Sequence, residues 1–347
     1  MASWWKRDRR RDAGWVAVAP SGRRAHAAHV VWPVQGGQRP QLRWACEVDW
    51  TDPARGLRQL HRQHRLTQAR CLAVLERQHY QLLPMDAPDV PRADWRDAVR
   101  WKLKDMVDFA VDEAGVDLLV VPPETSQRGR TSLLVAAAPQ HAVAALQHAA
   151  GEAGLPWQAV DVAETALRNL SRLCADTSTD ADGNRQAQAL LGLGETHSWL
   201  VVTAHGELLL SRQLDLTHAQ VDPHRGTVDR NQWERVALEL QRTLDHCDRL
   251  FNRVSLGRLL VGPIRPDQAA ALAPPADAAA GGEPAASFVA YLRELLYPPV
   301  QGFDLADLLD LSAVPALQDD LAAQSSFLSA IGAALRPTEP ATAEASS

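Results

Sequence analysis

The segment Gly14-Trp-Val-Ala-Val-Ala-Pro-Ser-Gly22 is a short apolar strand that runs into a Ser/Gly turn. In the second half of the chain, Ala189-Leu-Leu-Gly-Leu-Gly194 repeats this arrangement with a strand that ends in a glycine turn. Two more strands follow each copy, at residues 25–32 and 41–48 in the first and at 198–203 and 208–214 in the second. Because a pattern that returns at a long interval indicates a repeated structural unit, the sequence predicts two lobes, each of which begins with a β-meander.

Helices and strands alternate after each meander. Apolar residues at three- and four-residue steps predict helices, and short β-branched or apolar runs between turn residues predict strands. The predicted helices span residues 54–66, 92–109, 141–153, 163–175, 231–253 and 324–335, and the further strands span 69–75, 80–84, 118–121, 133–138, 157–162 and 255–262. This interleaving is typical of the α/β class.

Polar residues without periodicity at 176–184 mark the predicted domain boundary. We therefore expect a first lobe at residues 13–175, a linker at 176–188 and a second lobe with its terminal helix at 189–336. A basic tail at 1–12 and a tail of small and acidic residues at 337–347 are expected to be disordered.

The composition excludes several classes of protein. A net charge of −6 over 347 residues gives no sign of nucleic-acid binding. The four cysteines lie far apart, so no zinc or redox spacing is present, and they are expected to be reduced, buried thiols in a cytoplasm. No apolar run approaches the roughly 18–20 residues that span a bilayer, and no signal peptide is recognised. His61 and His64 lie on one predicted helix face without a third ligand nearby, so no metal site is predicted.

Five segments carry a resemblance to a known family. Residues 86–91 and 98–105 resemble the segment that marks the MshI family of MSHA-type pilus biogenesis proteins, and residues 164–170 and 211–215 are similar to later parts of the same family. Residues 330–336, Ala-Ile-Gly-Ala-Ala-Leu-Arg, resemble the terminal helix of the wider PilM family of type IV pilus assembly proteins.

The resemblance implies an actin-like fold, in which a ribonuclease-H-like unit occurs twice and forms two lobes. It also implies a cytoplasmic scaffold that lies peripherally at the inner membrane. Such a scaffold would bind the cytoplasmic tail of a small bitopic membrane protein. The pilus assembly ATPase is a further candidate partner.

In this family plan, the two glycine turns cradle the phosphates of a nucleotide. The family's first loop reads Gly-x-Asp-x-Gly, and Ala19 stands here at the aspartate, Ser21 at the second glycine and Gly22 next to it. In the second loop Gly192 stands at an aspartate and Gly194 keeps the glycine, and the adenosine-side motif is reduced to Gly262 followed by a proline.

Mg²⁺ bound with a nucleotide is held through acidic groups and water, and these acidic groups are missing. The sequence therefore predicts a degenerate nucleotide site, no cofactor and no catalysis, with weak ATP binding through the turn amides left open.

Two other functions stay open at this point. An active actin-like or Hsp70-type ATPase would need the missing acidic residues. A cytoplasmic L-type subunit of a type II secretion system would normally continue into a membrane helix, whereas this chain ends in a polar tail.

The partner's peptide is expected at the segment from Tyr80 to Pro91 and at the helix after it. In that helix the apolar residues Trp95, Val99, Leu103 and Met106 are expected to face the interior, which leaves Arg100 and Lys104 for the partner. The tail residues Trp4, Trp5, Lys6 and Arg7 form a candidate membrane-proximal segment, since tryptophan prefers the bilayer interface and basic residues are attracted to anionic lipid.

Overall fold

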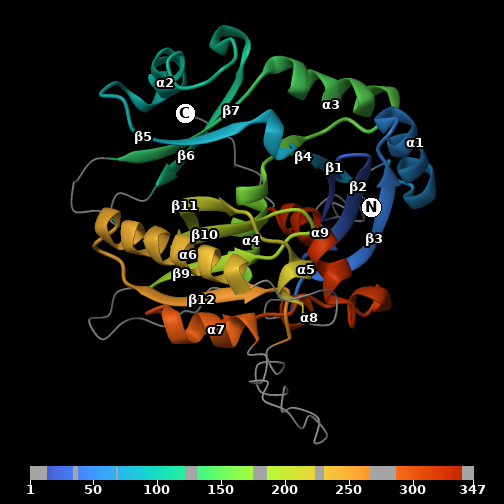
Figure 1. Cartoon of the computed structure of the whole chain (residues 1–347). Helices are drawn as coiled ribbons and strands as arrows, with labels where there is room; N and C mark the ends of the chain where they lie inside the picture. The colour runs from blue at the N-terminus through green and yellow to red at the C-terminus, as the bar shows by residue number, and fades with distance from the viewer. Residues whose placement is uncertain are drawn as a thin grey trace, which may run out of the picture.

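The computed structural model describes residues 14–33, 38–67, 69–121, 125, 131–174, 186–222, 230–265 and 287–337. The predicted tail at 1–12, most of the linker and residues 338–347 lie outside this range. The described part forms two lobes, each built on a five-stranded sheet, with a smaller three-stranded sheet next to the first (Figure 1).

The first lobe begins with the predicted meander. Strands β1 (Trp15–Ser21), β2 (Arg24–Val31) and β3 (Gln41–Asp49) pair antiparallel. After α1 (Pro53–His64), strand β4 (Arg70–Val74) lies parallel to β1, and β8 (Ala159–Asp161) lies parallel to β4. The strand order is β3-β2-β1-β4-β8. Helix α1 and helix α3 (Gln140–Glu152) pack together beside this sheet.

The second lobe repeats this order strand by strand. Strands β9 (Ala187–Gly192), β10 (Ser198–Ala204) and β11 (Glu207–Leu214) form the meander, and β12 (Leu256–Gly262) and β13 (Val300–Gly302) complete the order β11-β10-β9-β12-β13. Helices α5 (His218–Val221), α6 (Arg230–Leu250), α7 (Phe288–Leu295) and α8 (Leu305–Leu308) belong to this half. The identical order confirms the prediction of a duplicated α/β unit.

A small unit is inserted between β4 and α3. Strands β5 (Gln81–Asp86), β6 (Gly115–Val121) and β7 (Ser132–Ala138) form a sheet of their own with the order β5-β7-β6, and α2 (Trp95–Leu103) covers one face of it. The strands were predicted, but their separation from the main sheet was not.

The predicted helix at 92–109 is much shorter in the structure. A 3₁₀ turn occupies Arg92–Asp94, and α2 ends at Leu103, whose carbonyl accepts the amides of Met106 and Val107 in a final turn. The guanidinium of Arg100 donates to the carbonyl of Val111 at 2.9 Å and draws the following segment back toward the helix. Val99 and Leu103 are buried as expected, but Met106 is 44% exposed, so its assignment to the interior was wrong.

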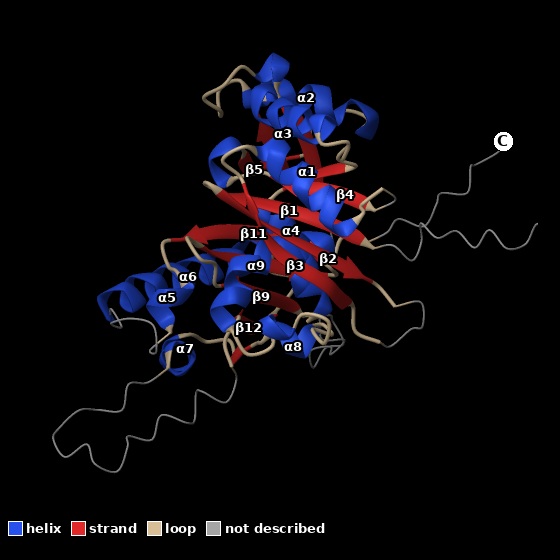
Figure 2. Cartoon of the chain, turned by 90° about the vertical axis from the view of Figure 1, so that its right-hand side faces the viewer, coloured by secondary structure: helices blue, strands red, loops and turns tan. Residues whose placement is uncertain are grey.

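The last helix of each lobe packs on the sheet of the other lobe. Helix α4 (Ala163–Leu173) lies against β9, β10 and β11, and α9 (Leu321–Ala334) lies against β1 and β2. The two helices contact each other in the centre of the molecule (Figure 2). One continuous apolar core therefore contains residues of both lobes, such as Leu72 of β4 and Leu190 of β9.

None of the helices in the described ranges is both long enough and apolar enough to cross a bilayer. The four cysteines are free thiols, and Cys71, Cys174 and Cys247 are buried. Burial raises the pKa of each of these three thiols to about 12.

Candidate functional site

The two glycine turns face each other across the junction of the lobes. Ala19 and Ser21 at the end of β1 line one small cavity together with Gly192 and Gly194 at the end of β9. These four predicted residues are therefore brought together. The cavity has a volume of about 130 Å³, whereas sites that hold drug-sized ligands and cofactors usually measure about 300–1000 Å³.

Leucine side chains of the exchanged helices occupy the space beside the second turn. A Cβ atom on Gly192 would lie 2.6 Å from Leu167 of α4 and 2.9 Å from Leu328 of α9. On α9, the hydroxyl of Ser325 donates to the carbonyl of Leu193 at 2.6 Å. The turn is thus packed against protein from both helices.

Backbone contacts account for the other glycines. A Cβ on Gly194 would lie 2.2 Å from the carbonyl oxygen of His197, and one on Gly262 would lie 2.3 Å from the carbonyl oxygen of Phe303. Gly22 adopts φ = 64° in the β1–β2 turn, which favours glycine. Gly22 and Gly262 do not line the small cavity.

A carboxylate is bound at the first turn. The amide of Gly22 donates to Oε1 of Glu76 at 2.8 Å, so a negative group of the protein itself lies where the family plan places phosphate. At the second turn, Glu195 accepts a hydrogen bond from Arg24 of the first lobe at 3.0 Å. Glu76 could not be recognised from the sequence, because it lies 54 residues from Gly22 and in no motif. Two carboxylates of the protein are thus held by protein groups at the turns, beside a space of about 130 Å³.

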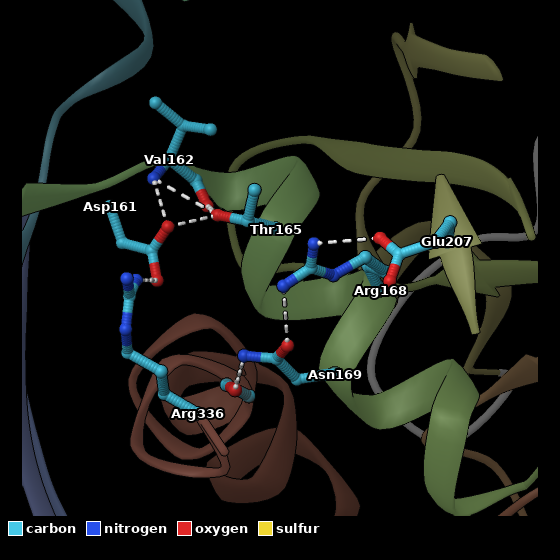
Figure 3. A network of polar contacts seen from close by, with 8 residues as sticks. Asp161, Val162, Thr165, Arg168, Asn169, Glu207 and Arg336 are labelled. Carbon is cyan, nitrogen blue, oxygen red and sulfur yellow. Dashed lines mark hydrogen bonds and ion pairs between the residues drawn. The ribbon is translucent and has the colours of Figure 1, made fainter. Parts of the chain in front are cut away.

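A network of polar contacts fixes α4 against the end of α9 (Figure 3). Arg336 pairs with Asp161 at 3.2 Å, and the side-chain amide of Asn169 donates to the carbonyl of Gly332 at 3.0 Å. On the other side of α4, Arg168 pairs with Glu207 of β11 at 3.4 Å. The same network holds the hydroxyl of Thr165 on Asp161. These contacts join both lobes around the exchanged helices.

Tyr80 is part of the interior and is 2% exposed. Its hydroxyl donates to the buried carboxyl group of Glu164 on α4 at 2.6 Å. Burial raises the pKa of Glu164 above its usual range, although the hydrogen bond from Tyr80 works in the opposite direction. The prediction that Tyr80 contacts a partner is corrected, because its side chain is not available at the surface.

A second cavity is much larger and lies between the inserted sheet and the second lobe. Its volume is about 1280 Å³, which is ample for a peptide segment. Four consecutive residues of β11, Leu209–Arg212, line its floor, and one face of α6 forms a wall. The opposite wall comes from the inserted unit through Leu82, Pro84 and Leu134. We call this space the groove.

The edge of a sheet is available in the groove. Strand β11 is the outermost strand of the second sheet and pairs only with β10 among the described strands. A strand in the middle of a sheet shows alternate residues to each side, so four consecutive lining residues indicate that β11 meets the groove along its edge. Leu238 of α6 is 47% exposed and gives this wall apolar surface.

Charged groups in the groove are mostly basic. Arg212, Arg235 and Arg242 line it, against Asp86 and Glu239. Arg212 is paired with Glu239 at 2.9 Å, whereas no ion pair within the described residues engages Arg242. The wall formed by α6 therefore carries unbalanced positive charge.

The other predicted partner residues lie outside the groove. Pro91 is exposed at the start of the 3₁₀ turn before α2, and Lys104 pairs with Asp112 at 3.4 Å. Helix α2 covers the other face of the inserted sheet, because Leu83 of β5 packs in one cluster with Val99 and Leu103 of α2 while Leu82 and Pro84 line the groove. The residues Trp4, Trp5, Lys6 and Arg7 lie outside the described range.

Within the described ranges, no three His, Cys, Asp or Glu side chains converge in a way that could hold a metal ion. His64 stacks on Trp44 with ring centroids 3.8 Å apart and lies 3.8 Å from the sulfur of Cys46. His64 therefore packs as an aromatic side chain.

Comparisons with known proteins agree with this architecture. The family described as type IV pilus assembly protein PilM matches residues 90–223, which include α2, α4 and the second meander. No curated protein matches the chain in sequence.

Among solved structures, the PilM-PilN type IV pilus biogenesis complex contains a chain that is 18% identical, with a TM-score of 0.63 over 94% of this chain and 100% of that chain. The cytoplasmic domain of EpsL from the type II secretion system of Vibrio cholerae is 12% identical, with a TM-score of 0.38 over 59% of this chain and 71% of that one. A Bacteroides thetaiotaomicron protein with an actin-like ATPase fold is 8% identical, with a TM-score of 0.45 over 90% and 98%. The chain has the two-lobed, actin-like fold that the sequence predicted.

Proposed function

We propose that this protein is a scaffold of a type IV pilus assembly complex that acts by binding. Its partner would be a small bitopic inner-membrane protein whose cytoplasmic tail occupies the groove. The observation that carries the proposal is the groove itself, with a volume of about 1280 Å³ and a free strand edge along its floor. The match of residues 90–223 to PilM and the likeness to the PilM-PilN complex support it.

The binding mode follows from β11. Extended peptides add to exposed sheet edges because backbone groups there are unpaired, and pockets for alternate side chains supply specificity. The apolar residues of α6 and β5 on the two sides would receive the side chains of such a peptide. The unbalanced arginines of α6 favour a tail that carries at least one acidic residue.

The finer assignment to an MSHA-like pilus rests on the sequence motifs at 86–91 and 98–105. In this proposal the protein is cytoplasmic and is held at the inner membrane through its partner, and contact with the assembly ATPase would use another face. The nucleotide site is degenerate and the protein is not an enzyme, which the bound Glu76 and the leucine packing at Gly192 support.

A matched pair of substitutions tests the groove. Leu238 and Leu295 are 47% and 48% exposed, but only Leu238 lines the groove. We expect Leu238→Arg to weaken binding of a synthetic peptide of the partner's cytoplasmic tail by about tenfold or more, as loss of an interface hot spot does. Leu295→Arg, on α7, should leave the affinity unchanged. Isothermal titration with the full-length protein measures both.

The same assay tests the site that the sequence favoured. Charge reversal by Arg100→Glu with Lys104→Glu leaves the groove lining intact. Loss of binding in this variant, together with full binding by Leu238→Arg, would place the binding site at α2 and refute the groove as the binding site.

A further inference from the structure

Helix α1 carries a line of arginines on its exposed face. Arg55, Arg58 and Arg62 follow one another at steps of three and four residues, and Arg65 follows three residues later as the C-cap. Residues at these steps lie on one side of a helix, and all four arginines are exposed while Ala54, Leu57 and Leu60 are buried against the sheet. We call these four residues the arginine stripe.

Little negative charge balances the stripe. Within the described part of the chain, the one ion pair that involves it joins Arg58 to Glu152 at 3.6 Å. Asp49 lies near Arg55, and its pKa is lowered by hydrogen bonds from Thr51 first and by the charge of Arg55 to a smaller extent. The half of the helix that contains Arg62 and Arg65 therefore keeps its positive charge.

The N-terminal segment enters the lobe at the same end of α1. The chain runs from Arg65 to Arg70 at the start of β4, which pairs with Trp15 at the start of β1. The guanidinium of Arg70 lies 5.8 Å from the centroid of the Trp15 ring. Trp32, which follows β2 at this end of the sheet, is 39% exposed. The tail that precedes Gly14 contains Lys6, Arg7, Arg9, Arg10 and Arg11.

The stripe suits a flat partner. Neither of the two cavities described above reaches it, because both are lined by residues of other elements. The four arginines lie between residues 55 and 65, which is ten helical steps or about 15 Å, so all four can meet a flat surface at once. In Figure 1, α1 lies at the right edge of the molecule and α6 at the left, so a surface at α1 leaves the groove accessible.

We propose that the arginine stripe docks on an anionic lipid bilayer. Basic residues near anionic lipid each strengthen binding by about fivefold, and tryptophan prefers the bilayer interface. The contact would orient the first lobe toward the membrane while the groove receives a peptide from a protein that the same membrane holds. Two weak contacts then reinforce each other through effective concentration. The competing occupant is an acidic protein surface.

Vesicle binding by the full-length protein tests the proposal. The variant Arg62→Glu with Arg65→Asn removes two positive charges and adds one negative charge, and asparagine tolerates the left-handed backbone of residue 65, where φ is 51°. The matched control Arg249→Glu with Arg253→Asn makes the same chemical change at exposed positions of the second lobe, at and just beyond the end of α6. Both pairs are also made in a protein whose five basic tail residues are replaced by glutamine.

With phosphatidylglycerol vesicles, we expect the stripe variant to bind at least about 25-fold more weakly than its parent in both backgrounds, because the loss of each of its two positive charges weakens binding about fivefold and the new carboxylate is repelled. The control pair should bind like its parent, and phosphatidylcholine vesicles should bind none of the proteins. Unchanged binding by the stripe variant in the tail-neutral background overturns the proposal. Polyaspartate serves as a probe for an acidic protein surface. If the stripe variant loses polyaspartate binding but keeps vesicle binding, the proposal is also overturned, in favour of an acidic protein partner. Peptide binding in the groove is measured in parallel and shows that each variant is folded. The outcome of this peptide assay does not depend on whether the vesicle assay supports or overturns the proposal.

Discussion

A contact with another part of the protein accounts for the glycines at the second turn. Gly192 receives Leu167 and Leu328, and Gly194 lies against the carbonyl of His197. The sequence shows glycines at these positions and suggests phosphate binding as the reason. It cannot show that leucines from two helices take up this space, because one helix precedes the turn and the other lies near the end of the chain.

Substitution of Gly194 tests this structural explanation. Gly194→Ala places a methyl group 2.2 Å from a backbone oxygen, so we expect the free energy of unfolding to fall by about 1–3 kcal/mol, as overpacking does. Gly151→Ala in α3 is the control, because nothing lies within 4 Å of the new methyl group, and it should stabilise by roughly 0.5–1 kcal/mol. Urea denaturation measures both. Equal stability of the Gly194 variant and the parent would mean that the turn is free to move.

The buried Glu164 predicts a pH dependence of stability. Burial raises the pKa of this carboxyl group in the folded state, so the folded protein holds a proton that the unfolded chain releases. The stabilisation linked to this proton is fully present below the ordinary pKa of glutamate. It is lost as the pH rises through the raised pKa of the folded state. Glu164→Gln keeps the acceptor for Tyr80 without this proton, and its advantage over the parent should grow with pH. Urea denaturation at several pH values measures the free energy of unfolding of each protein, with Glu234→Gln as an exposed control. Parallel curves of this free energy against pH for the parent and Glu164→Gln would contradict the prediction.

At the scale of elements, strands were easier to predict than helix ends. All six strands of the two meanders form where alternating apolar residues and glycine turns predicted them. Helix 92–109 failed at its C-terminal half because Val107 and Phe109 continue the apolar spacing although the chain has turned. The side-chain bond from Arg100 to the Val111 carbonyl favours the turn, and such a bond leaves no signal in the periodicity. Strand β13 and helix α7 were missed because both are short.

The inserted unit has a small core of its own, which makes a local prediction possible. Leu103 is fully buried there with Val99, Leu133 and Val135. Leu103→Ala should cost about 2–5 kcal/mol within this core. We expect hydrogen exchange to accelerate in β5, β6 and β7, while β9 and β10 keep their protection, because units of this kind open separately. Uniform acceleration through both lobes would show instead that the unit unfolds only together with them.

At the scale of the molecule, the duplicated strand order was predictable from the repeated turns, whereas the exchange of α4 and α9 was not. Helix α4 has one apolar face and α9 carries apolar residues on several sides, but neither sequence indicates which sheet the helix covers. The groove was also hidden, because it forms between β5 and α6, which belong to different halves of the chain. Only the β5 side of it was anticipated, in the expectation of a partner at residues 80–91.

The filled junction between the lobes predicts inactivity toward nucleotides. With Mg²⁺ and ATP, we expect no release of phosphate above that of a heat-inactivated sample. The melting temperature should not change either, although a nucleotide present at a hundred times its dissociation constant would stabilise the fold by about 2.7 kcal/mol. Saturable turnover, or a melting temperature that rises with ATP concentration, would contradict this prediction and favour an active ATPase.

The exchange of α4 and α9 has a consequence during translation. The sheet of the first lobe is complete once β8 has left the ribosome, but the helix that covers its inner face begins only at Leu321, near the end of the chain. At about 5–20 residues per second, the nascent chain spends roughly 10 to 30 s with that apolar face uncovered. We therefore expect the nascent protein to bind a chaperone during this interval, and a product truncated before residue 321 to aggregate.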